Sequence, residues 1–70
     1  MVFLTDRQDK LLRKARELTD SNDELWTTSD TDTEECRDLD RKGLLMEGLP
    51  FVFIITPAGR AWLAEKEKQQ

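Results

Sequence analysis

Apolar residues in the first third of the chain recur at the spacing of a helix face. They are Leu11, Leu12, Ala15 and Leu18. Thr5 and Gln8 stand just before them with the spacing of a capping box, in which each side chain satisfies a backbone N–H at the helix start. The pattern predicts a helix over about residues 6–18.

Polar residues dominate the next stretch, residues 19–31, which reads as a loop. Leu25 and Trp26 are its only large apolar residues, and they predict a very short strand that anchors the loop, with Trp26 in the core. A second helix follows over about residues 32–42, starting at a capping box of Thr31 and Glu34 and ending before Gly43.

The last third of the chain combines a hairpin with a helix. Residues 44–46 and 51–55 predict two strands joined by a turn over 47–50. Thr56 and Pro57 have the types expected at the N-cap and first position of a final helix, and residues 65–70 read as a frayed tail. The predicted core contains Leu11, Leu18, Leu39, Phe53 and Trp62.

These elements predict one α+β domain spanning residues 1–70, with three helices, a β-hairpin in the C-terminal half and a third short strand near Leu25 and Trp26. A chain this short buries only about 60% of the surface that its unfolded form exposes. The domain is therefore expected to be marginally stable without a partner.

Two segments resemble winged-helix domains. Residues 39–45 read Leu-Asp-Arg-Lys-Gly-Leu-Leu, and residues 55–63 read Ile-Thr-Pro-Ala-Gly-Arg-Ala-Trp-Leu. The resemblance covers mainly residues 31–64 and implies a helix that runs into a wing and a capped final helix. It also implies a truncated version of the fold, because residues 19–31 leave no room for the helix that normally precedes the recognition helix.

Charge is distributed unevenly along the chain, whose net charge is −4. Residues 20–40 contain nine acids and one base, whereas residues 7–16 contain five bases and one acid. Such an asymmetry bears on the choice of partner and not on the fold.

The sequence offers little for catalysis. It has no histidine, so Cys36 has no histidine base that would activate its thiol, and Cys36 is expected to be a small buried apolar residue. No phosphate-binding loop is present, and the acids from Asp30 onward do not match a calcium loop. We therefore expect a non-enzymatic protein without cofactor or metal. The chain start does not resemble a signal peptide, no apolar run could span a membrane, and one lone cysteine suits a reducing compartment, which together predict a cytoplasmic protein.

Two functional interpretations remain open. The first is an interaction protein whose acidic face, residues 20–40, binds a protein partner with a basic surface. Such a protein suits an accessory factor or inhibitor of a nucleic-acid-binding protein, of the kind that phages and other mobile elements encode. Its expected binding residues are Asp30, Asp32, Glu34, Glu35 and Asp38.

The second interpretation is a small DNA-binding regulator. Its phosphate contacts would come from the first helix and one side of the second, through Arg7, Lys10, Arg13, Lys14, Arg37, Arg41 and Lys42. It is disfavoured because acids crowd the start of the second helix and the hairpin contains no base.

The second strand of the hairpin is apolar on both faces, which is unusual for a strand covered on one side only. We expect Val52 and Ile54, together with Met46 and Leu49, to form an exposed apolar patch that self-associates or is covered by a partner. The intramolecular alternative is that residues 1–4 fold back over this face.

Overall fold

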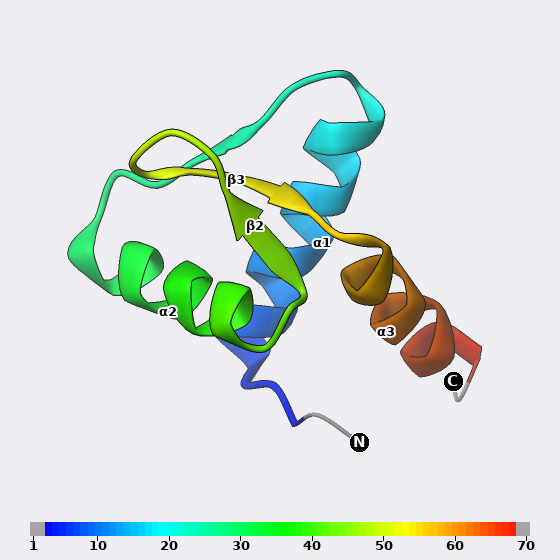
Figure 1. The fold of residues 1–70 in the computed structure, drawn as a ribbon. Coiled ribbons are helices and arrows are strands. Elements are labelled where there is room, and N and C mark those ends of the chain that lie inside the picture. The colour runs from blue at the N-terminus through cyan, green and yellow to red at the C-terminus, as the bar shows by residue number, and fades with distance from the viewer. Residues whose placement is uncertain (1–2, 69–70) are drawn as a thin grey trace.

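The computed structural model describes residues 3–68 (Figure 1). Its elements are α1 (Asp6–Asp20), β1 (Leu25–Trp26), α2 (Asp30–Arg41), β2 (Leu45–Glu47), β3 (Val52–Ile55) and α3 (Pro57–Lys68). The predicted α+β class is confirmed, including the two-residue strand at Leu25 and Trp26.

Side-chain caps define the starts of the helices. The capping box of Thr5 and Gln8 is present at α1, with both reciprocal hydrogen bonds at 3.2 Å. The predicted capping box at the second helix is wrong, because α2 begins earlier and its N-cap is Ser29, whose hydroxyl accepts from the Asp32 N–H at 3.1 Å. Ser29 has extended backbone and Thr31 is already helical, so the hydroxyl of Thr31 cannot cap the first turn.

The end of α2 and the start of α3 are joined by local hydrogen bonds. Gly43 has a φ of 80°, and the N–H groups of Gly43 and Leu44 donate to the carbonyls of Asp40 and Leu39, both at 2.9 Å. This is a Schellman motif, as expected after a helix that ends in a glycine. The Thr56 hydroxyl donates to the Gly43 carbonyl at 2.6 Å and accepts from the Gly59 N–H at 3.0 Å, so Thr56 caps α3 as predicted.

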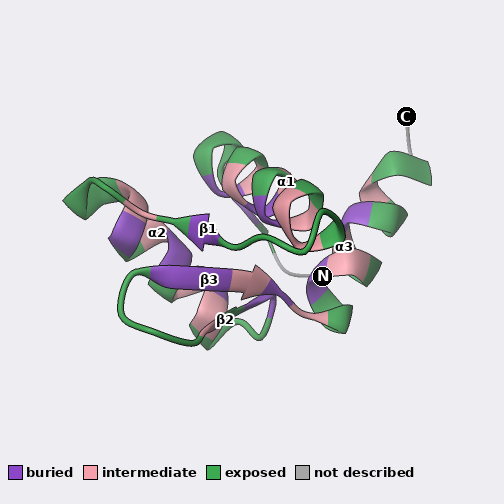
Figure 2. Ribbon diagram, turned by 90° about the horizontal axis from the view of Figure 1, so that it is seen from above, coloured by how far each residue is buried: buried purple, intermediate pink, exposed green. Residues whose placement is uncertain are grey.

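The sheet is antiparallel with the order β1-β3-β2. Leu25 pairs with Phe53 and Leu45 with Ile55, and all four side chains face the helices and are buried. Trp26 pairs with Val52 and Met46 with Ile54, which places these four side chains on the opposite face. In Figures 1 and 2, α1 lies along one side of β3.

The core lies between the sheet and the three helices, and it includes the fully buried Leu12, Leu39, Phe53 and Leu63 (Figure 2). Leu39 and Phe53 were predicted there correctly. Leu11, Leu18 and Trp62 only flank it and are partly buried, so the prediction for these three is too strong. The expectation that Trp26 anchors the core is wrong, since Leu25 is buried and Trp26 is 62% exposed.

Residues near both ends of the chain belong to the helical part of the fold. Leu4 is buried in the core, whereas Phe3 is exposed, and Met1 and Val2 lie outside the described residues. Leu4 therefore serves the helices and not the opposite sheet face. The predicted frayed tail differs from the structure over residues 65–68, which continue α3, while residues 69–70 lie outside the described part.

Candidate functional site

The five acids predicted to bind a partner do not form one free surface. Three of them face α1: Asp32 pairs with Arg7 at 3.4 Å, and Glu35 accepts from the Thr5 hydroxyl at 3.5 Å. Asp38 accepts from Lys42 and from Gln8, both at 2.7 Å, and these hydrogen bonds hold its pKa below the usual value. Of these five acids, Asp30 and Glu34 are exposed and form no ion pair or hydrogen bond through their side chains with residues 3–68.

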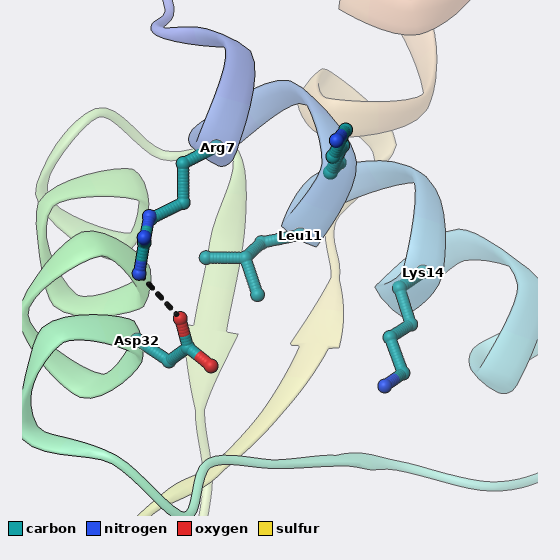
Figure 3. A pocket seen from close by; sticks show the side chains of 5 residues that line it. Arg7, Leu11, Lys14 and Asp32 are labelled. Carbon is teal, nitrogen blue, oxygen red and sulfur yellow. Dashed lines mark hydrogen bonds and ion pairs between the residues drawn. The ribbon is translucent and has the colours of Figure 1, made fainter.

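The seven predicted nucleic-acid-binding cations also separate in space. Arg7, Lys10 and Lys14 line a hollow of about 430 Å³ together with Leu11 and Asp32 (Figure 3). Figure 3 shows Asp32 of α2 reaching Arg7 across this hollow.

The other four cations lie elsewhere. Arg13 pairs with Asp9 and Glu67. Arg37 pairs with Glu47 at 3.5 Å and stacks on the Phe51 ring, and Arg41 and Lys42 pair with Asp38. The structure thus brings together three of the seven.

The face of the sheet opposite the helices carries several exposed apolar side chains. We call it the outer sheet face, and it consists of Trp26, Met46, Leu49, Val52 and Ile54. Leu49 is 66% exposed and Met46 51% exposed. The prediction that Val52 is exposed is wrong: it is only 3% exposed and forms the floor of a groove of about 320 Å³.

Glu24, Gly48, Leu49, Val52 and Ile54 line this groove. In the register of the sheet, Gly48 follows the end of β2 and its N–H donates to the Val52 carbonyl at 3.0 Å. Sequence reasoning missed Trp26 as a member of the outer sheet face, and it missed Glu24 and Gly48 as residues that line the groove. The only available signal was a Glu-Leu-Trp run with one apolar residue for each face, and a strand of two residues gives no periodicity from which to assign them.

The single cysteine, Cys36, packs in the core. Cys36 is fully buried, as predicted, and burial raises the pKa of its thiol to about 12, with the nearby Asp32, Glu35 and Glu47 carboxylates adding to the shift. A thiol with this pKa stays protonated at neutral pH and is a poor nucleophile. Within residues 3–68, no cluster of acids and cysteine has the arrangement of a metal site, and no helix is long and apolar enough to cross a membrane.

Asp9 is the most connected acid on α1, and it joins α1 to α3. It accepts from Arg13 at 2.7 Å and from Lys66. Burial alone would raise the pKa of Asp9, but the hydrogen bonds from Lys66 and Arg13 outweigh it, so the pKa is lowered from 3.8. Because the charged form is favoured in the folded state, protonation of Asp9 opposes folding.

We therefore expect the free energy of unfolding to be retained at neutral pH and to fall as the pH drops below about 4. Asp9→Asn should lower the free energy of unfolding by about 1 kcal/mol at pH 7, which is in the upper range for such ion pairs. It should also make the further fall of this free energy at acid pH less steep. Urea unfolding at pH 7 and at lower pH measures both effects. An acid loss in Asp9→Asn as steep as in the unmodified chain would contradict the role of this carboxylate.

Comparisons of this chain with protein-family models, with curated proteins and with solved structures find no match. The functional argument therefore depends on the chain's own surfaces.

Proposed function

We propose that this chain is a non-enzymatic interaction domain that binds a protein partner with a basic surface through its outer sheet face. The observation that carries the proposal is the exposure of Trp26, Met46 and Leu49 on the side of the sheet opposite the buried Leu25, Phe53 and Ile55. Apolar side chains gathered on one face of a small domain mark an interface or an aggregation risk. Trp is also the residue type most enriched among energetically dominant interface residues.

Charge around the outer sheet face supports a basic partner. Residues 23–30 and 44–56, which form β1, the hairpin and their flanks, contain four acids and no base. Complementary charge at an interface raises the association rate and selects against like-charged partners. The acidic face predicted from residues 20–40 is thereby narrowed to Asp23, Glu24 and Asp30, each within four residues of Trp26 along the chain. Glu47 on the hairpin is already paired with Arg37.

The winged-helix resemblance is compatible with this proposal. The order helix, strand, helix, hairpin, helix matches what the resemblance implies for a truncated domain. The helix that corresponds to the recognition helix, α2, carries acids in its first turn, and its bases Arg37, Arg41 and Lys42 are paired with acids of the same chain. A domain with these paired charges on α2 would therefore bind its partner through a surface other than α2.

The proposal is tested by Leu49→Asp, with Phe3→Asp as the matched control. Both residues are exposed and apolar, and both changes add one negative charge, but Phe3 precedes α1 and is not part of the outer sheet face. With a partner captured from the native host and then purified, Leu49→Asp should lower the affinity at least about tenfold, because a carboxylate replaces an apolar contact and must be desolvated. Calorimetric titration measures the affinity. An equal loss in both variants, or no loss in Leu49→Asp, would refute the outer sheet face as the interface.

Nucleic-acid binding is the second candidate, and the hollow between Arg7, Lys10 and Lys14 is the observation in its favour. A mobility-shift assay with random duplex DNA at low salt separates the two functions. Under our proposal the unmodified chain gives no shift. A clear shift that weakens steeply with salt and disappears in a Lys10→Glu, Lys14→Glu double variant would favour the second candidate.

A further inference from the structure

Gly48 lines the groove on the outer sheet face and places no side chain in it. Trp26 and Val52 are cross-strand neighbours, and Gly48 lies on the other side of Val52. A Cβ built on Gly48 would meet no heavy atom within 4 Å, so there is open space for a side chain at Gly48. Val52 and Ile54 of β3 line the groove together with Glu24, Gly48 and Leu49, and Trp26 is the cross-strand neighbour of Val52.

The groove is large enough to hold an aliphatic side chain. Its volume of about 320 Å³ is roughly ten times the share of one water molecule in the liquid. Its wall contains Leu49, Val52 and Ile54, and Glu24 contributes the only ionisable group of the lining. An aliphatic side chain seated there would contact Leu49, Val52 and Ile54, while a cation next to it would reach the Glu24 carboxylate.

The charge of the groove argues against a second copy of this chain as the occupant. Pairing two outer sheet faces about a two-fold axis would bring Glu24 of each copy into the interface, and residues 23–30 and 44–56 offer no base to pair with them. Burying a carboxylate without a partner is costly. A partner that supplies the cation avoids this cost.

We propose that the groove binds an aliphatic side chain of the partner protein, flanked in the partner's sequence by lysine or arginine that pairs with Glu24. This inference rests on the proposed function, and it adds the chemistry that the partner must present. Gly48 and Glu24 are the two residues that define the specificity: the first leaves the space, and the second selects the charge.

A capped synthetic peptide with one leucine between two lysines is the probe. Titration into the ¹⁵N-labelled chain should shift the amide of Val52 and the indole of Trp26, and it gives a dissociation constant. Gly48→Leu fills the groove and should raise that constant about tenfold, because the peptide leucine loses its buried contacts. Glu24→Gln should raise it up to about fivefold, the range of an exposed ion pair.

Matched controls separate the groove from general charge attraction. Glu34→Gln removes an exposed acid of α2 outside the groove lining and should leave the dissociation constant unchanged. A peptide with serine in place of leucine, and one with glutamates in place of the lysines, should each bind at least about fivefold more weakly. Equal effects of Glu24→Gln and Glu34→Gln, or unchanged binding by Gly48→Leu, would overturn the inference, as would peptide-induced shifts away from Val52 and Trp26.

The two proposals fail in different ways. If the native partner loses affinity for Leu49→Asp but binds Gly48→Leu and Glu24→Gln as tightly as the unmodified chain, the interface stands and the groove chemistry is wrong. If the native partner binds Leu49→Asp unchanged, the outer sheet face itself is wrong. Sedimentation equilibrium should show a monomer, and a two-fold dimer that Gly48→Leu dissociates would identify a second copy as the occupant and overturn this inference.

Discussion

Replacing Phe53 with alanine is expected to cost about 3–5 kcal/mol of folding free energy, the usual range for a buried aromatic side chain. Phe53 is fully buried at the middle of the central strand, where it pairs with Leu25 on one side and with Glu47 on the other. Domains have about 0.05–0.15 kcal/mol of stability per residue, so a 70-residue chain has little to spare. A large part of the Phe53→Ala protein should be unfolded at 25 °C.

Urea unfolding followed by circular dichroism measures this effect. Ile54→Ala is the matched comparison, because Ile54 is the next residue of β3 but lies half-buried on the outer sheet face. Its cost should be clearly smaller, since less surface is re-exposed and no enclosed cavity is left. Similar costs for the two variants would show that the two faces of the sheet are equally packed, contrary to the structure.

Local chemistry explains which parts of the fold could be predicted. Thr5, Gly43 and Thr56 each meet a backbone requirement that depends only on a few neighbouring residues, and all three boundaries are confirmed. The start of α2 could not be fixed in the same way. Ser29 and Thr31 stand two positions apart and both have capping side chains, so the sequence around them fits either start of the helix.

The surfaces were harder to predict because they depend on contacts between elements far apart in the chain. The charges of residues 7–16 and 20–40 looked like two opposite patches, but Arg7 reaches Asp32 and Gln8 reaches Asp38 across the α1–α2 contact. Sequence order alone does not show that these helices face each other. The outer sheet face was found in part, since alternation along β3 places Val52 and Ile54 together, but the partner strand that adds Trp26 is too short to show a pattern.

Gly59→Ala is expected to destabilise the protein by about 1–3 kcal/mol or more, the range for a forced steric clash in a packed region. Gly59 is in the first turn of α3, where a change from glycine to alanine would ordinarily favour the helix by up to about 1 kcal/mol. Here a Cβ would lie 2.2 Å from the Leu44 carbonyl oxygen and 2.8 Å from Cγ1 of Ile55. The steric conflict therefore decides the sign.

The structure around Leu44 leaves little room for relief of this clash. The N–H of Leu44 donates to Leu39 at 2.9 Å, and its carbonyl accepts from the Thr56 N–H at 3.2 Å, so the backbone of Leu44 is held at both ends. The alternative is for α3 to move outward, which would loosen the fully buried Leu63 and the ion pair between Arg16 and Glu67 at 2.9 Å.

Thermal unfolding by circular dichroism should therefore show a lower midpoint for Gly59→Ala, by roughly 4–8 °C for each kcal/mol in a domain of this size. Gly48→Ala is the control, because its Cβ would meet nothing within 4 Å and its midpoint should stay close to that of the unmodified chain. A midpoint for Gly59→Ala equal to or above that of Gly48→Ala would mean that α3 does not approach Leu44 as closely as the structure places it. In that case the helix propensity of alanine would prevail over the contact between α3 and the α2–β2 connection.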